Sequence, residues 1–142
     1  MMKKLFTNVV MAKASKEQVL TILENPETLL QWVPEVQTVT QAANAFTVHR
    51  SGAALNQTEH IAVGKTANQV VYRSTEGRVA YDLIFDLAGE AGGTTITETV
   101  YLDETAVPHL ALTLLAPIAK HAFGENLDHL AELAERLSYT NS

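Results

Sequence analysis

The sequence of 142 residues contains no cysteine. This absence excludes disulfide bonds, iron–sulfur clusters, thiolate zinc sites and a cysteine nucleophile. Because disulfides are typical of secreted proteins, a chain without cysteine fits a reducing compartment, and we expect a cytoplasmic protein. Two lysines before an apolar run outline a signal peptide, but Thr7 and Asn8 interrupt that run. We therefore expect residues 3–13 to be retained as a first β-strand.

Positive charge and long hydrophobic stretches are also scarce. Ten basic residues stand against 16 acidic residues, so the net charge is -6, and there is no basic run. Phosphate backbones and anionic bilayers repel such a surface, so we expect no binding to nucleic acid. The most apolar stretch, residues 109–123, is shorter than the roughly 20 residues that span a membrane. We therefore expect no stable membrane insertion.

A metal ion or a cofactor is not expected either. The chain has five histidines, and His121 and His129 lie eight residues apart in the C-terminal segment. A helix would hold these two about 12 Å apart, which is too far to share one ion. The sequence also lacks a zinc-protease motif, a phosphate loop and a hydrolase nucleophile elbow.

The composition is that of a folded domain. Hydrophobic residues make up 46% of the chain and charged residues 18%, which favours a packed core, and the length predicts one domain, residues 1–142. Ser15 begins a Ser-x-x-Gln capping box at the start of a short helix. Asn25 and Pro26 then begin a second helical turn, which Pro34 ends.

The central part of the chain shows the two-residue period of β-strands. The predicted strands are residues 35–41, 45–51, 55–63, 68–75, 78–88 and 94–103. The connections between them are short, so neighbouring strands must be antiparallel. Which face each residue of the strands at 45–51, 55–63 and 68–75 occupies stays open.

The chain ends in a long predicted helix. Its apolar stripe repeats at helical spacing and comprises Leu112, Ala116, Ala119, Phe123, Leu127, Leu130, Ala134 and Leu137. Two alanines in the first half leave space under the helix, whereas we expect Leu127, Leu130 and Leu137 to pack more tightly. Pro117 removes an amide donor, which predicts a kink or a new helix start at that residue.

This order of elements, with three local stretches, resembles the helix-grip fold of the START-related superfamily, which includes polyketide cyclase/dehydrase-like (SRPBCC) proteins. The stretches are NPETLLQWVPEV at 25–36, GGTTIT at 92–97 and FGENLDHLAELAERL at 123–137. The resemblance implies an α+β fold in which a curved, antiparallel, seven-stranded sheet wraps around the C-terminal helix, with two short helices between strands one and two. It implies a cavity between sheet and helix more strongly than it implies an enzyme.

Glu98 is the residue that most clearly could act in catalysis or ligand binding. It lies on the same, apolar face of its strand as Ile96, Val100 and Leu102. We therefore expect a poorly solvated carboxyl with a raised pKa. The alternative is that the strand twists outward at this point, or that Glu98 forms a structural ion pair with Arg73, Arg78 or Lys120. Tyr81 is the second catalytic candidate, because it shares the apolar face of its strand with Phe85.

The predicted ligand-binding residues follow from the same faces. They are Trp32, Tyr72, Tyr81, Phe85, Glu98, Val100, Leu112, Ala116, Ala119 and Phe123. Core packing is the alternative for the two tyrosines, and Trp32 would alternatively attach the second short helix to the sheet.

Three functions remain open. One is binding or carriage of a hydrophobic molecule that is lipid-, isoprenoid- or polyketide-like. Another is a cyclase or dehydratase in which Glu98 and a tyrosine do acid–base chemistry. The third is a protein-interaction module. It arises because Leu110, Leu114 and Ile118 project away from the sheet and need a cover, which also suggests a homodimer.

Overall fold

The structure is a computed structural model, and it describes residues 2–43, 45–51, 56–103, 105 and 109–140, with the backbone alone for residues 109, 110 and 140. In chain order the elements are β1 (Met2–Ala12), α1 (Lys16–Leu23), the 3-10 turn η1 (Pro26–Thr28), α2 (Leu29–Trp32), β2 (Val36–Ala42), β3 (Ala45–Arg50), β4 (Thr58–Lys65), β5 (Gln69–Thr75), β6 (Tyr81–Glu90), β7 (Gly93–Asp103) and α3 (His109–Thr140).

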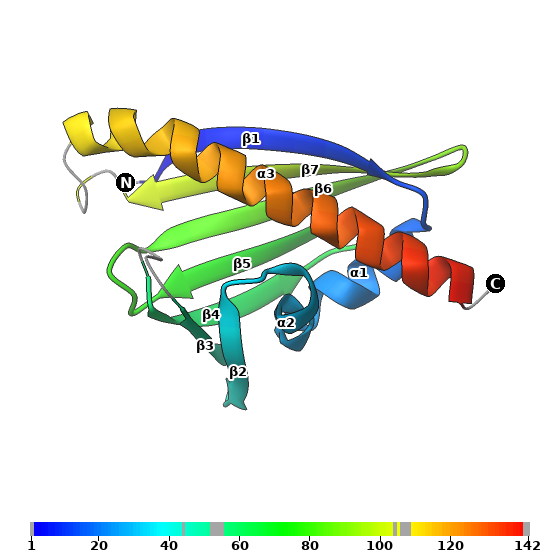
Figure 1. Ribbon diagram of the computed structural model, residues 1–142, viewed down its shortest axis with the longest axis horizontal. Helices are drawn as coiled ribbons and strands as arrows, with labels where there is room; N and C mark the ends of the chain where they lie inside the picture. The colour runs from blue at the N-terminus through cyan, green and yellow to red at the C-terminus, as the bar shows by residue number, and fades with distance from the viewer. Residues whose placement is uncertain (1, 44, 52–55, 104, 106–108, 141–142) are drawn as a thin grey trace.

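The seven strands form one antiparallel sheet around α3. The strand order is β1-β7-β6-β5-β4-β3-β2, so β1 and β2 are the two edges although they are neighbours in sequence. The short elements α1 and α2 make this crossing from one edge to the other, and both contact α3. Figure 1 shows α3 running across one face of the curved sheet. The predicted fold is therefore confirmed.

The helix starts follow from the predicted caps. The Ser15 hydroxyl accepts from the amide of Gln18 at 3.1 Å, and the amide of Ser15 donates to the Gln18 side chain at 3.0 Å. The Asn25 side chain accepts from the amide of Glu27 at 3.2 Å. These bonds satisfy amides that the first turn of a helix leaves without partners, so the chain can turn sharply after β1.

The core lies between the sheet and the C-terminal half of α3. On β6 as far as Leu87, and along β7, every second residue is buried, as their alternation predicts. Leu127, Leu130 and Ala134 of α3 are buried against this face. Leu137 is 40% exposed, so the expectation that it packs tightly is wrong: the helix there has passed the end of the core.

Pro117 does not start a new helix. α3 is a single helix from His109 to Thr140 with Pro117 inside it, which corrects the prediction of a fresh start. Pro117, which has no amide hydrogen to donate, lies in an exposed part of the helix. Interrupting the helix hydrogen bonds costs less there than it would in the core.

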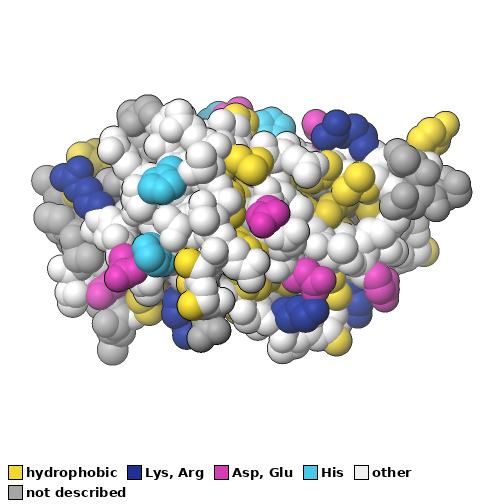
Figure 2. Space-filling model, turned by 90° about the horizontal axis from the view of Figure 1, so that it is seen from below, with side chains coloured by type: hydrophobic (Ala, Val, Ile, Leu, Met, Phe, Trp, Pro, Cys, Tyr) yellow, Lys and Arg dark blue, Asp and Glu magenta, His cyan; other side chains and the backbone are white. Residues whose placement is uncertain are grey.

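The surface carries charges of both signs. In the view of Figure 2, acidic, basic and hydrophobic side chains are interspersed. No helix in the part of the chain that the structure describes is long and apolar enough to cross a membrane.

Candidate functional site

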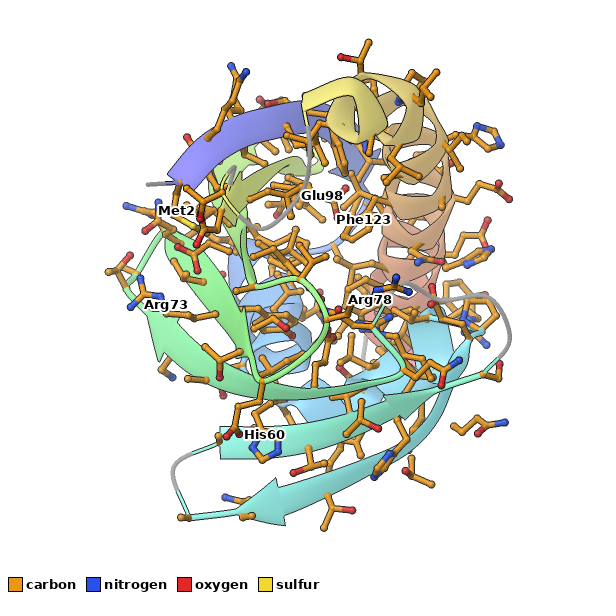
Figure 3. All side chains as sticks on the ribbon, turned by 90° about the vertical axis from the view of Figure 1, so that its left-hand side faces the viewer. Met2, His60, Arg73, Arg78, Glu98 and Phe123 are labelled. Carbon is orange, nitrogen blue, oxygen red and sulfur yellow. The ribbon has the colours of Figure 1, made fainter. Side chains whose placement is uncertain are left out.

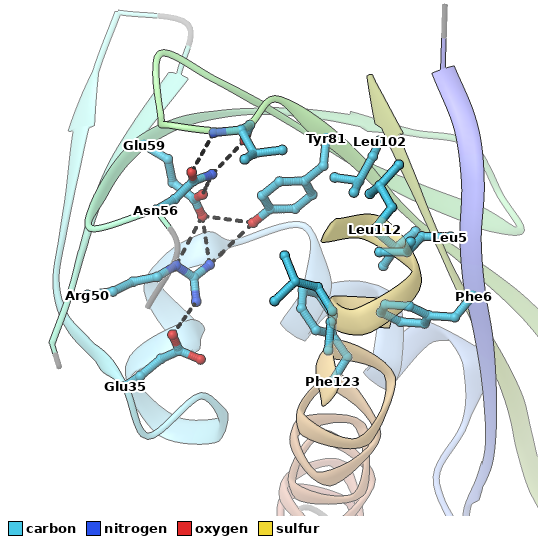
Figure 4. A pocket seen from close by; sticks show the side chains of 14 residues that line it. Leu5, Phe6, Glu35, Arg50, Asn56, Glu59, Tyr81, Leu102, Leu112 and Phe123 are labelled. Atoms are coloured by element: carbon cyan, nitrogen blue, oxygen red, sulfur yellow. Dashed lines mark hydrogen bonds and ion pairs between the residues drawn. The ribbon is translucent and has the colours of Figure 1, made fainter. Parts of the chain in front are cut away.

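A cavity of about 150 Å³ lies between the sheet and the N-terminal half of α3. Its walls come from β1, β6, β7 and α3, and most of them are apolar (Figure 4). The apolar and aromatic lining residues are Leu5, Phe6, Val79, Tyr81, Val100, Leu102, Leu112, Leu115, Ala119 and Phe123. The polar lining residues are Glu35, Arg50, Asn56 and Glu59, and they lie together at one end.

Glu59 is the centre of this polar end. It is completely buried, and both of its carboxylate oxygens accept hydrogen bonds. Oε1 accepts from Arg50 Nη2 at 2.6 Å, Arg50 Nε at 3.2 Å and the Tyr81 hydroxyl at 2.8 Å. Oε2 accepts from Asn56 Nδ2 at 2.9 Å and the Ser74 hydroxyl at 3.0 Å. A buried carboxylate is stable here because donors surround it and one of them is a cation.

Asn56 holds the loop after β3 against the start of β6. Its side chain donates to the carbonyl of Val79 at 2.7 Å and accepts from the amide of Val79 at 2.8 Å. Gly77 makes room for it, since a Cβ on that residue would lie 2.6 Å from the Asn56 side chain. The polar end is thus tied to the backbone on two sides.

The protonation states of this cluster follow from its burial. Burial, and then the neighbouring Glu59, raise the pKa of the Tyr81 hydroxyl well above its usual range, so Tyr81 is a neutral phenol. Burial by itself lowers the pKa of Arg50, but the interactions with Tyr81 and Glu59 outweigh it and leave the pKa above its ordinary value. Arg50 is therefore a permanent cation facing a carboxylate.

Glu98 lies in a second, smaller space next to this cavity. It is 1% exposed and sits on β7 between Ile96 and Val100, on the buried face, as predicted. The smaller cavity has a volume of about 30 Å³, and Glu98 shares its lining with Tyr81 and Phe123. Figure 3 shows Glu98 and Phe123 in the interior between sheet and α3.

The surroundings of Glu98 weaken its acidity. Asn8 Nδ2 donates to Glu98 Oε1 at 3.2 Å and to the carbonyl of Lys120 at 3.0 Å. Burial raises the pKa of Glu98 to about 8, against the opposite effects of the Asn8 hydrogen bond and the Lys120 charge. Arg73, one possible ion-pair partner, instead contacts Asp82 at 3.3 Å on the outer face of the sheet.

The predicted site residues divide into three groups. Those that line the larger cavity are Tyr81, Val100, Leu112, Ala119 and Phe123. Those that line the smaller cavity are Trp32, Tyr72, Tyr81, Glu98 and Phe123. Phe85 and Ala116 line neither of these two cavities.

Core packing explains the aromatic residues that the larger cavity does not include. Phe85 is fully buried and makes edge-on ring contacts with Trp32 at 6.2 Å and Tyr72 at 5.5 Å. The Tyr72 hydroxyl donates to the carbonyl of Leu23 at the end of α1. Trp32 thus attaches α2 to the sheet, the alternative considered for it.

The polar end of the cavity was not predicted from the sequence, although the alternation along β3 and β4 indicates it. Glu59 is two residues from the buried Ile61 and so points to the same face of its strand. Arg50 stands in the same relation to the buried Val48. This is the pattern that identified Glu98. What the strands alone could not supply is that β3, β4 and β6 bring Arg50, Glu59 and Tyr81 to one point.

The strand order and the long C-terminal helix define the class of the structure: a helix-grip fold. No family model matches the sequence, and no curated protein matches it.

Solved structures, in contrast, match the chain over nearly its whole length. A START superfamily protein from Mycobacterium smegmatis has 20% identity and a TM-score of 0.68, and covers 99% of each chain. The Zhui aromatase/cyclase from Streptomyces sp. R1128 has 15% identity, a TM-score of 0.76 and coverage of 96% of this chain and 95% of its own. Norcoclaurine synthase from Thalictrum flavum, in complex with a transition-state analogue, has 13% identity, a TM-score of 0.68 and coverage of 94% of each chain. These likenesses establish the fold.

A metal centre has no support in the described part of the chain. No group of three or more acidic or histidine side chains there could hold a metal ion.

Proposed function

We propose that the protein binds or carries a small hydrophobic molecule in the cavity between the sheet and α3. The observation that supports this most directly is the lining, which is mostly apolar and has its polar residues gathered at one end. A dry apolar cavity of about 150 Å³ is large enough to take up a benzene-sized molecule. The lipid-, isoprenoid- or polyketide-like ligand would therefore place one ring or a short branch inside the cavity.

The first experiment is mass spectrometry of the purified protein, in its native state and after organic extraction. A stoichiometric hydrophobic compound is the expected result. The Ala119→Leu variant should lose this compound, because Ala119 lines the cavity and a larger side chain fills the space. Ala122→Leu is the matched control, since Ala122 is an exposed residue of the same helix.

Two results would contradict this function. One is a protein that carries no compound and takes up none when incubated with small aromatic and isoprenoid molecules. The other is equal ligand content in the Ala119→Leu and Ala122→Leu variants, which would put the ligand outside the cavity.

A cyclase or dehydratase is the second candidate. Its support is the buried Glu98, whose pKa of about 8 suits an acid or base at neutral pH. The observation against a cyclase or dehydratase is that Glu98 lines the smaller cavity of about 30 Å³, which has room for little more than water. A substrate would have to extend past Phe123 and Tyr81 to reach it. Loss of turnover in Glu98→Gln, with ligand binding retained, would favour this candidate.

The homodimer through Leu110, Leu114 and Ile118, and with it the interaction module, remains a proposal. Leu114 is 65% and Ile118 is 67% exposed, and the Leu110 side chain lies outside the described residues. Sedimentation velocity at tens of micromolar, with Ile118→Lys for comparison, would test it: a monomeric wild type would remove the proposal.

A further inference from the structure

The charges at the polar end restrict which ligands fit the cavity. The charged side chains among its described lining residues are one cation, Arg50, and two carboxylates, Glu35 and Glu59. Glu35 Oε2 lies 3.6 Å from Arg50 Nη1, and Glu59 Oε1 lies 2.6 Å from Arg50 Nη2. The cation is therefore neutralised before a ligand arrives, and one negative charge is left over.

The geometry of Arg50 adds to this restriction. Its Nε and Nη2 atoms, which form one of the two guanidinium edges that can clamp a carboxylate, both already donate to Glu59, and Nη2 also contacts the Tyr81 hydroxyl at 3.4 Å. An anionic ligand would have to displace Glu59, which is completely buried and would lose its counterion. Binding of a carboxylate at this edge would thus break the cluster that holds β3, β4 and β6 together.

The third nitrogen of Arg50 is in a different situation. Nη1 has Glu35 as its partner among the described residues, at 3.6 Å, which is longer than a hydrogen bond. This nitrogen can donate to a ligand oxygen without disturbing Glu59. A carbonyl or hydroxyl oxygen accepts such a bond and carries no charge, so Glu35 does not repel it.

We infer that the cavity selects uncharged ligands with a carbonyl or hydroxyl group, which accepts from Arg50 Nη1 while the hydrocarbon part fills the apolar walls, and that it rejects carboxylates of the same size. This selectivity rests on the proposed function of the cavity as a ligand site. It predicts ketones, esters, phenols or alcohols as the ligand class and excludes free fatty acids and other carboxylates.

The test is a matched pair of probes, acetophenone and benzoate, which share a phenyl ring and differ in charge at pH 7.5. Binding is followed by NMR titration of the backbone amides around the cavity and of the Arg50 Nε–H signal. Acetophenone should give saturable shifts of cavity residues. Benzoate should bind at least about tenfold more weakly, because it meets an excess carboxylate in a region of reduced dielectric.

The variant that isolates the charge effect is Glu35→Gln. The Glu35 side chain is 37% exposed, so its replacement leaves the fold intact. Benzoate binding should strengthen severalfold, so the ratio of the acetophenone affinity to the benzoate affinity should fall. Glu132→Gln is the matched control, because Glu132 is an exposed residue on the outer side of α3, and it should change neither affinity.

The possible results separate this inference from the function on which it rests. If wild-type protein binds benzoate as well as acetophenone, or if Glu35→Gln leaves the ratio of the two affinities unchanged, the charge selection is wrong and the cavity remains a ligand site. If neither probe shifts cavity residues, both the selection and the proposed ligand site are wrong.

Discussion

Replacing Glu98 by Gln should change how the stability of the protein depends on pH. Glu98 is buried, and its pKa in the folded protein is about 8, compared with an ordinary value of 4.5 that applies in the unfolded chain. The folded state therefore binds this proton more tightly than the unfolded state does. The contribution of Glu98 to stability is complete below pH 4.5 and is lost as the pH rises through 8.

The size of the effect follows from the two pKa values. Between the unfolded and the folded pKa, Glu98 lowers the free energy of unfolding by up to about 1.4 kcal/mol per pH unit, which amounts to about 3 kcal/mol at pH 7. Gln cannot ionise, so the free energy of unfolding of the Glu98→Gln variant does not fall in this way as the pH rises. Its amide is a poorer fit than a protonated carboxyl beside Asn8, which costs about 1 kcal/mol at every pH. The variant should be slightly less stable than wild type at pH 5 and about 2 kcal/mol more stable at pH 7.

Urea unfolding at pH 5, 6, 7 and 8 measures this difference. Trp32 is the one tryptophan of the chain and is 2% exposed, so its fluorescence reports unfolding directly. All other titrating groups are common to both proteins and cancel in the difference. The exposed Glu132→Gln variant should differ from wild type by an amount that does not depend on pH. A Glu98→Gln difference that also stays constant from pH 5 to 8 would refute the account of a neutral, buried Glu98.

Two further predictions concern stability. Gly93→Ala should destabilise the protein by about 1–3 kcal/mol in urea unfolding, because the new Cβ would lie 2.2 Å from a backbone oxygen of β1. Gly64→Ala has open space and should be neutral or stabilising; similar losses at both glycines would contradict this reasoning. Glu59→Gln should cost about 3–5 kcal/mol, since it leaves Arg50 with only Glu35, which is partly exposed and lies 3.6 Å away, as a counterion. Glu24→Gln removes an exposed ion pair and should cost under about 1 kcal/mol; an equally small loss at Glu59 would show that the buried cluster adds little.

Much of the fold was predictable because it depends on local patterns. Alternation along β6 and β7 predicted which side chains are buried, including Glu98 among apolar neighbours. The caps at Ser15 and Asn25 predicted where the helices start. Boundaries were less accurate: the strand predicted at 78–88 begins at Tyr81 and runs to Glu90, because the turn to β7 is tighter than the run of glycines around it indicated.

The site was predictable only in part. Helical spacing put Leu112, Ala119 and Phe123 on one stripe, and all three line the larger cavity, because residues on one stripe of a helix face the same partner. The same spacing included Ala116, which is half-buried but lines neither cavity. A periodic pattern indicates a direction, but it does not say where along that direction the neighbouring side chains leave space.

The sequence by itself determined the elements, their order and the buried face of the clearest strands, since these follow from backbone propensity and from the periods of helix and strand. Only the tertiary structure decided that Arg50, Glu59 and Tyr81 meet, while Glu98 lies in a smaller space that Arg50 and Tyr81 also line. Strand register and sheet curvature set the distances between residues far apart in the chain, and those depend on the packing of the whole sheet against α3. The cavity, its polar end and its charge are consequences of that packing.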